Sequence, residues 1–255
     1  MSLVITECPV TGVDRIAINR PGKRNAINPD TRKELIDVLT NSLSDDAVKA
    51  IVMGSTEGHF CAGGDINSMV ELDARSARKR MKENHQLVRV FAEAEKPIIA
   101  AVEGFAVGAG AGIALLCDTI VLSEEGSLGF PFFRVGLTPD YGILFTLARR
   151  VGLAKARQIL LFSKNLKGHD ALKVGLADIV VEKGAAEEYA CVCAEELIKM
   201  PRHAFALTKR HLAMEPQTLE EALEMEALSQ TLAFLGPEFE EGRLAFQEKR
   251  KPKFQ

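Results

Sequence analysis

The sequences FCAGGDI at residues 60–66 and GFAVGAGAG at residues 104–112 form two glycine-rich turns. Each follows a short apolar run that is typical of a buried strand, at residues 50–53 and 97–102. Neither turn has the G-x-G-x-x-G spacing of a dinucleotide site. A single turn of this kind often serves only tight packing between a helix and a strand. Two of them, with a helix starting near Gly110, predict a paired backbone N–H site for an anion or a developing oxyanion.

Strand-like and helix-like segments alternate around these turns. Another buried strand is predicted at residues 119–122, and strands separated by helices indicate parallel crossovers and an α/β architecture. Residues 3–7 and 13–19 predict a hairpin at the start of the chain. Thr31 and Glu34 have the spacing of a capping box at the start of the first helix.

The pattern changes after about residue 185 and becomes almost entirely helical. No flexible linker precedes this part, so it is predicted to be an appendage of the same fold. We therefore divide the chain into a core over residues 1–195 and a helical region over residues 196–255, which ends in a basic tail.

Composition narrows the class of protein. The 255 residues carry a formal net charge of −3, which argues against a nucleic-acid coat or a membrane-surface protein. The five cysteines are scattered without zinc-ligand spacing, and the five histidines show no metal motif. No apolar run is long enough to span a membrane. We expect a reduced, cytoplasmic protein that needs no metal or redox cofactor.

Ordered sequence segments across nearly the whole chain resemble those of the crotonase, or enoyl-CoA hydratase/isomerase, superfamily. The segments that carry the resemblance are INRP at 18–21, NAI at 25–27, FCAGGDI at 60–66, KPIIAAVEG at 96–104, AVGAG at 106–110, CD at 117–118, GLTPD at 136–140 and FQEKRKP at 246–252. The resemblance implies a spiral of stacked ββα turns with a C-terminal helical trimerisation region. It also implies a homotrimer or a dimer of trimers, and an acyl-CoA thioester as substrate.

By position, the resemblance assigns the oxyanion hole to the backbone N–H groups of Ala62 and Gly110. Such donors stabilise the enolate oxygen that forms when a proton is removed next to a thioester, by on the order of 3 kcal/mol each. Coenzyme A enters as part of the substrate. The residues that the resemblance places near it, or near the acyl group, are Lys23, Arg24, Ala26, Gly64, Asp65, Ile66, Phe132, Tyr141, Lys249 and Lys253.

The two glutamates of a hydratase are absent from this chain. Their positions are occupied by Gly112 and Phe132. Adding water to a double bond needs one group to hold the water and another to deliver the proton. Ordinary hydratase chemistry is therefore not favoured.

Asp140 is the carboxylate available instead, at a position that some isomerases and ring-modifying members of the superfamily use. Apolar neighbours such as Phe132 and Tyr141 are expected to raise its pKa toward an acid/base range. The structural alternative is a turn residue after Pro139 that caps the next helix. Asp65 is predicted to be a structural or coenzyme A-site residue and not a base. Surface or packing roles are the expectation for Glu103 and His85, with catalysis the alternative for Glu103 and substrate contact the alternative for His85.

These observations predict an enoyl-CoA isomerase that shifts a double bond with Asp140 as its acid and base. The alternatives within the superfamily are a hydratase, a thioester hydrolase or an enzyme acting on ring-bearing acyl-CoA. A different class remains open as well, namely a non-catalytic acyl-CoA-binding or RNA-binding protein on the same fold.

Overall fold

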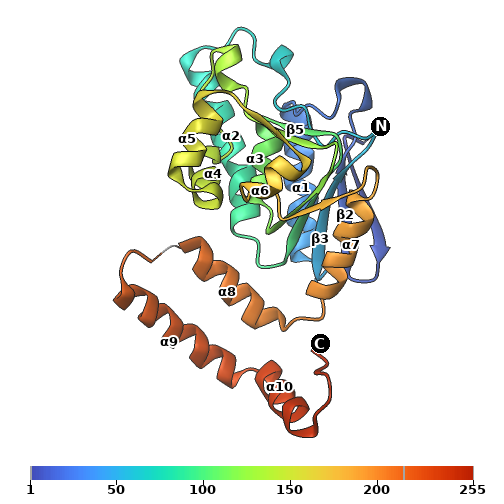
Figure 1. Ribbon diagram of the computed structural model, residues 1–255, viewed down its shortest axis with the longest axis vertical. Helices are drawn as coiled ribbons and strands as arrows, with labels where there is room; N and C mark the ends of the chain where they lie inside the picture. The colour runs from blue at the N-terminus through green and yellow to red at the C-terminus, as the bar shows by residue number, and fades with distance from the viewer. Residues whose placement is uncertain (1, 215, 255) are drawn as a thin grey trace.

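The computed structural model describes residues 2–214 and 216–254 and contains two sheets surrounded by helices (Figure 1). The larger sheet has the strand order β1-β2-β3-β4-β6-β9, and the smaller one has the order β5-β7-β8. The strands are β1 (Val4–Val10), β2 (Val13–Ile18), β3 (Ala50–Ser55), β4 (Ile98–Val102), β5 (Phe105–Val107), β6 (Thr119–Ser123), β7 (Ser127–Gly129), β8 (Asn165–Lys167) and β9 (Ile179–Val181).

Helices cover both faces of the larger sheet and continue beyond it. They are α1 (Pro29–Ser44), α2 (Ala74–Ala92), α3 (Ala109–Leu116), α4 (Ile143–Val151), α5 (Leu153–Leu161), α6 (Gly168–Lys173), α7 (Ala186–Leu197), α8 (Arg202–Met214), α9 (Leu219–Leu235) and α10 (Pro237–Glu248). Short 3-10 turns lie at η1 (Pro21–Lys23), η2 (Ile66–Ser68) and η3 (Phe132–Val135).

The predicted hairpin and parallel strands are confirmed. β1 pairs with β2 antiparallel, whereas β2, β3, β4, β6 and β9 run parallel. Side chains of β3 alternate between two apolar clusters, because successive residues of a strand face opposite sides. Ile51 and Met53 pack toward α1, α2 and α3, and Ala50 and Val52 pack toward α7.

The predicted capping box at α1 is wrong. Asn28 caps this helix, with its side-chain oxygen accepting from the backbone N–H of Thr31 at 2.8 Å. Glu34 instead accepts from the N–H groups of Leu3 and Val4 at 3.1 and 3.2 Å. The carboxylate thus holds the start of β1 onto α1, which local sequence spacing does not indicate.

Helices α8, α9 and α10 extend away from the layered core (Figure 1). The Nζ of Lys209 on α8 donates to Asp118 at 2.7 Å and to the carbonyl of Lys96 at 2.9 Å, which fixes this helix to the core. The division that we predict after residue 195 falls two residues before the end of α7, whose alanines pack on the sheet. That division stays a prediction. Within the described ranges no helix has the length and apolar character to cross a membrane.

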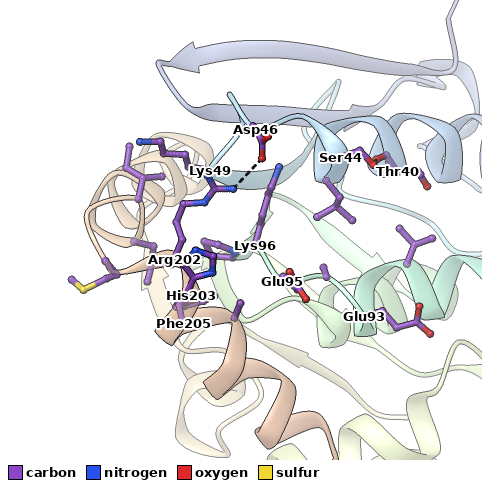
Figure 2. A pocket seen from close by; sticks show the side chains of 18 of the residues that line it. Thr40, Ser44, Asp46, Lys49, Glu93, Glu95, Lys96, Arg202, His203 and Phe205 are labelled. Atoms are coloured by element: carbon purple, nitrogen blue, oxygen red, sulfur yellow. Dashed lines mark hydrogen bonds and ion pairs between the residues drawn. The ribbon is translucent and has the colours of Figure 1, made fainter. Parts of the chain in front are cut away.

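A large hollow of about 840 Å³ separates α8 from the core (Figure 2). Several of its charged side chains are engaged with one another or with backbone. Arg202 pairs with Asp46 at 3.6 Å, and the Nζ of Lys96 donates to the carbonyl oxygens of Ser42 and Asp45 at 2.9 and 2.6 Å. This hollow therefore lies at the junction between the appendage and the core, and the glycine turns do not line it.

Candidate active site

The two glycine-rich turns lie side by side and are joined by backbone hydrogen bonds. The N–H of Cys61 donates to the carbonyl of Phe105 at 3.0 Å, and the N–H of Val107 donates to the carbonyl of Cys61 at 2.9 Å. Gly63 has φ +100°, and a Cβ on it would lie 2.8 Å from the carbonyl oxygen of Val107. Only glycine allows this backbone conformation and this approach at once.

A cavity of about 110 Å³ opens between these turns, α2 and the loop before α4. The lining of this site cavity includes Gly64, Arg80, Asn84, Ala109, Asp140 and Tyr141. Asp140 is the only acidic residue among the described residues that line it. The structure thus brings the predicted carboxylate and both turns to one place.

Ala62 does not fit its predicted role as an oxyanion donor. Its backbone N–H donates to the carbonyl oxygen of Arg24 at 3.0 Å, so this hydrogen is already used. Gly64 also lines the site cavity. Its N–H makes no hydrogen bond within the described part of the chain. The first turn therefore offers Gly64 rather than Ala62.

Gly110 is likewise displaced from the site. A Cβ on Gly110 would lie 2.6 Å from both the Cβ and the carbonyl oxygen of Cys61, so this residue is pressed against the first turn. Ala109 lines the site cavity, whereas Gly110 does not. Ala109 begins α3, and the first N–H groups of a helix have no acceptor within that helix. The second turn therefore presents Ala109.

The side chain of Asp140 does not cap α4. The backbone carbonyl oxygen of Asp140 accepts from the N–H of Ile143 at 3.1 Å instead. Asp140 also lines the cavity. One carboxylate oxygen accepts from the Nδ2 of Asn84 at 3.3 Å. Burial raises the pKa of Asp140, against the opposing effects of Arg80, Asn84 and His85. A carboxyl group with a raised pKa suits both removal and return of a proton.

Asn84 of α2 binds Asp140 and links it to a buried polar network. Asn84 is 2% exposed, and its Oδ1 accepts from Arg32 at 3.0 Å and from the hydroxyl of Tyr141 at 3.4 Å. Arg32 in turn pairs with Glu83. Because Oδ1 is committed to these donors, the amide nitrogen is directed at the carboxylate.

Packing around Gly112 explains why the first hydratase carboxylate is absent. A Cβ on Gly112 would lie 2.6 Å from the Cβ of Tyr141 and 3.3 Å from the Cγ1 of Ile143. A glutamate there would have to displace Tyr141, which is 3% exposed. The second position is Phe132, a buried apolar side chain of the cavity wall.

The residues predicted to bind coenzyme A divide into two groups. Lys23, Arg24, Ala26 and Ile66 surround the first turn, with Lys23 and Arg24 exposed, and Ile66 61% exposed. Asp65 pairs with Arg20 at 3.1 Å and accepts from the N–H of Asn67, so it shapes this rim.

The basic tail belongs to the second group. Lys249 and Lys253 lie at the end of α10 and are not among the residues that line the site cavity. The backbone N–H of Lys253 donates to Glu241. Within one chain these lysines do not line the site cavity, and their contact with coenzyme A stays a prediction.

Other candidate residues lie outside the cavity lining. Glu103 accepts from the N–H of Ala186 at 3.0 Å at the start of α7. His85 is exposed on α2 and does not line the site cavity. Burial raises the pKa of the Cys61 thiol to about 12, as expected of an unreactive buried cysteine.

Sequence reasoning missed three residues of the site: Arg80, Asn84 and Ala109. Arg80 and Asn84 share a face of α2 with Leu87 and Phe91, at helical spacing. The signal that could have found them is that these polar residues continue the buried apolar face of the helix. Ala109 was missed because the oxyanion donor was assigned to the neighbouring glycine, Gly110.

Comparisons with known proteins identify the class of this chain. Residues 10–255 match the family model described as enoyl-CoA hydratase/isomerase, and the chain belongs to this family. It is 34% identical over 238 residues to the short-chain-enoyl-CoA hydratase of Clostridium acetobutylicum, covering 92% of this chain and 91% of that protein.

Another relative carries a different activity in its name. The chain is 31% identical over 248 residues to the 1,2-epoxyphenylacetyl-CoA isomerase of Escherichia coli, covering 95% of each. In structure, it matches an enoyl-CoA hydratase from Polaromonas sp. JS666 with a TM-score of 0.93, at 26% identity and 99% coverage of both chains. The fold is therefore the predicted crotonase fold.

Proposed function

We propose that this protein is an enoyl-CoA isomerase that moves the double bond of a 3-enoyl-CoA to the 2,3 position. The Asp140 carboxylate takes a proton from C2, and the electron pair of that C–H bond forms an enolate. The same carboxyl group then returns the proton to C4 as the double bond forms between C2 and C3. No atom is gained or lost, and Asp140 ends in the state in which it began.

The observation that carries this proposal is the single carboxylate of the site cavity. Asp140 is the only acid among the described residues that line it, and burial raises its pKa. One group that alternates between base and acid is enough for a proton shift. Hydration asks for two such groups, and packing of Tyr141 against Gly112 fills the space of one of them.

The enolate oxygen would be held by the backbone N–H groups of Gly64 and Ala109, which replace the predicted pair Ala62 and Gly110. Both belong to turns that are hydrogen-bonded to each other, so the donors are fixed before the substrate arrives. Preorganised donors of this kind lower the barrier to enolate formation. The exposed cations Lys23 and Arg24 beside the first turn suit the phosphates of coenzyme A.

The test combines 2-enoyl-, 3-enoyl- and ring-bearing acyl-CoA substrates with mass analysis of the products. The wild type should convert a 3-enoyl-CoA without a change in mass. Asp140→Asn should lower kcat by roughly 10²- to 10⁴-fold, the usual effect of losing an acid/base group. Asp170→Asn, at an exposed aspartate of α6, is the matched control and should keep wild-type turnover. Wild-type kcat in Asp140→Asn would contradict the proposal.

Hydration is the second candidate, because the Clostridium acetobutylicum relative is named a hydratase. The same assay separates the candidates: a product heavier by one water indicates hydration, and released coenzyme A indicates thioester hydrolysis. Binding without turnover of any substrate would favour the non-catalytic alternative. Tight, salt-dependent RNA binding would favour its RNA-binding form.

A homotrimer or dimer of trimers, in the cytoplasm, is part of the same proposal. Apolar side chains stand exposed on the helical appendage, including Leu228 at 67%, Leu235 at 81% and Phe246 at 86%. Exposed apolar surface of this kind is typical of an interface. Sedimentation equilibrium should give three or six copies, and a monomer at micromolar concentration would contradict this part.

A further inference from the structure

The site cavity contains a cation that the isomerisation does not use. Arg80 lines the cavity from α2, on the same face as Asn84 and one helical turn before it. A Cβ on Gly64 would lie 3.9 Å from the Nη2 of Arg80. The guanidinium therefore stands next to the turn that would hold the thioester carbonyl.

Few protein groups satisfy this guanidinium. Its Nη1 donates to the carbonyl and hydroxyl oxygens of Ser68 at 3.4 and 3.3 Å, which are long hydrogen bonds. Among the described residues Arg80 makes no other hydrogen bond and no ion pair. Arg32 of α1, by contrast, is hydrogen-bonded to Asn84 and paired with Glu83.

The electrostatic surroundings make the unpaired charge costly. Burial lowers the pKa of Arg80, and the charge of Arg32 adds to this effect. The facing groups that oppose it are Tyr141, Asp140 and Glu83. An anion bound at Arg80 would offset the cost of burial. A guanidinium with a free edge suits a carboxylate, which it can bind through two parallel hydrogen bonds.

The dimensions limit where such a carboxylate can lie. Arg80 and Gly64, the residue that would hold the thioester carbonyl, line the same site cavity. Arg80 is close to Gly64, so only a few bonds can separate the second anionic group from the thioester carbonyl.

We propose that Arg80 is a specificity-determining residue that selects acyl-CoA thioesters carrying a second, free carboxylate on a short acyl chain of about four or five carbons. This inference rests on the proposed function for the position of the thioester at Gly64 and Ala109. It adds the substrate class, which the double-bond shift alone leaves open.

Binding of saturated ligands tests this inference separately from catalysis. Calorimetry would compare glutaryl-CoA with its half-amide and with pentanoyl-CoA, which have the same number of acyl carbons but no charge at the end. The wild type should bind glutaryl-CoA about ten- to a hundredfold more tightly than the half-amide, as for a hydrogen-bonded charged pair. Arg80→Gln should reduce this preference to less than about threefold. Arg78→Gln, at an exposed arginine of α2, should leave it unchanged.

Three outcomes would overturn the inference: no preference for glutaryl-CoA in the wild type, a preference that persists in Arg80→Gln, or equal weakening of all three ligands by that substitution. The last result would mean that Arg80 only supports the fold or the thioester end. None of these ligands has a double bond to move. A preference for the carboxylate would therefore stand even if the Asp140→Asn assay contradicted isomerisation, and the two failures can be told apart.

Discussion

Adding one methyl group to Gly112 tests the packing that we hold responsible for the missing hydratase carboxylate. In Gly112→Ala the new Cβ would lie 2.6 Å from the Cβ of Tyr141, and 3.3 and 3.4 Å from two carbons of Ile143. Carbon atoms in contact prefer separations of about 3.5–4.0 Å. The overlap with Tyr141 is therefore about 1 Å, and both neighbours are buried with little room to move.

The expected cost follows from two opposing terms. Overpacking by a methyl group in a close-packed core destabilises by about 1–3 kcal/mol. Alanine gains about 1 kcal/mol over glycine inside a helix, and Gly112 lies within α3. The two terms leave a net loss of up to about 2 kcal/mol, which corresponds to a Tm lower by up to roughly 8 °C in a chain of this size. Because Tyr141 adjoins Asp140, kcat on a 3-enoyl-CoA should fall as well.

Thermal unfolding and steady-state kinetics of purified Gly112→Ala measure both effects. Gly22→Ala is the matched control, because a Cβ on Gly22 would meet nothing within 4 Å. It should leave Tm and kcat near wild type. A Gly112→Ala protein with unchanged or higher Tm and unchanged kcat would refute the packing argument. The absence of a glutamate at this position would then need another cause.

Three further results are expected at the site. The kcat/KM for a 3-enoyl-CoA should rise with pH through the raised pKa of Asp140. Asn84→Ala should move this rise to higher pH, because the hydrogen bond from Asn84 favours the charged carboxylate. An unchanged pH profile in this variant would mean that another group titrates. Burial favours the protonated form of Asp140, so its contribution to stability is present in acid and lost as pH rises through the raised pKa. Asp140→Asn should therefore gain Tm over the wild type at neutral pH but not in acid, and the opposite order in differential scanning calorimetry would contradict the assigned burial. Iodoacetamide should leave Cys61 unmodified in the native protein while exposed Cys8 reacts, as peptide mass mapping can show, because burial raises the pKa of Cys61 to about 12.

The elements that sequence predicts well are those with a strong local pattern. The apolar runs at 50–53, 97–102 and 119–122 became β3, β4 and β6, because buried parallel strands are apolar on both faces. Glu34 shows the limit of local spacing. It fits a capping box in sequence, yet it binds the N–H groups at the start of β1, a contact between segments some thirty residues apart. Tertiary contacts of this kind leave no local mark.

The prediction of the site was correct in outline and wrong in detail, again because tertiary contacts decide the detail. Sequence brought both turns and Asp140 into one hypothesis, and the structure places all three around one cavity. It could not tell which amide of a turn is free, because that depends on the acceptor opposite. Ala62 meets the carbonyl of Arg24, and this pairing joins two segments that are far apart in the chain.

The same packing suggests why the carboxylate sits on a loop in this protein. A glutamate at position 112 would project from α3, but Tyr141 occupies that space with φ +51°, a conformation that non-glycine residues seldom adopt. This conformation is tolerated because the Tyr141 hydroxyl reaches Asn84 and its ring is buried. The turn that contains Tyr141 also places Asp140 at the cavity. The same turn geometry therefore fills the space beside Gly112 and places the Asp140 carboxylate at the cavity, so a glutamate at position 112 would fit only if the 140–142 turn were rebuilt with it.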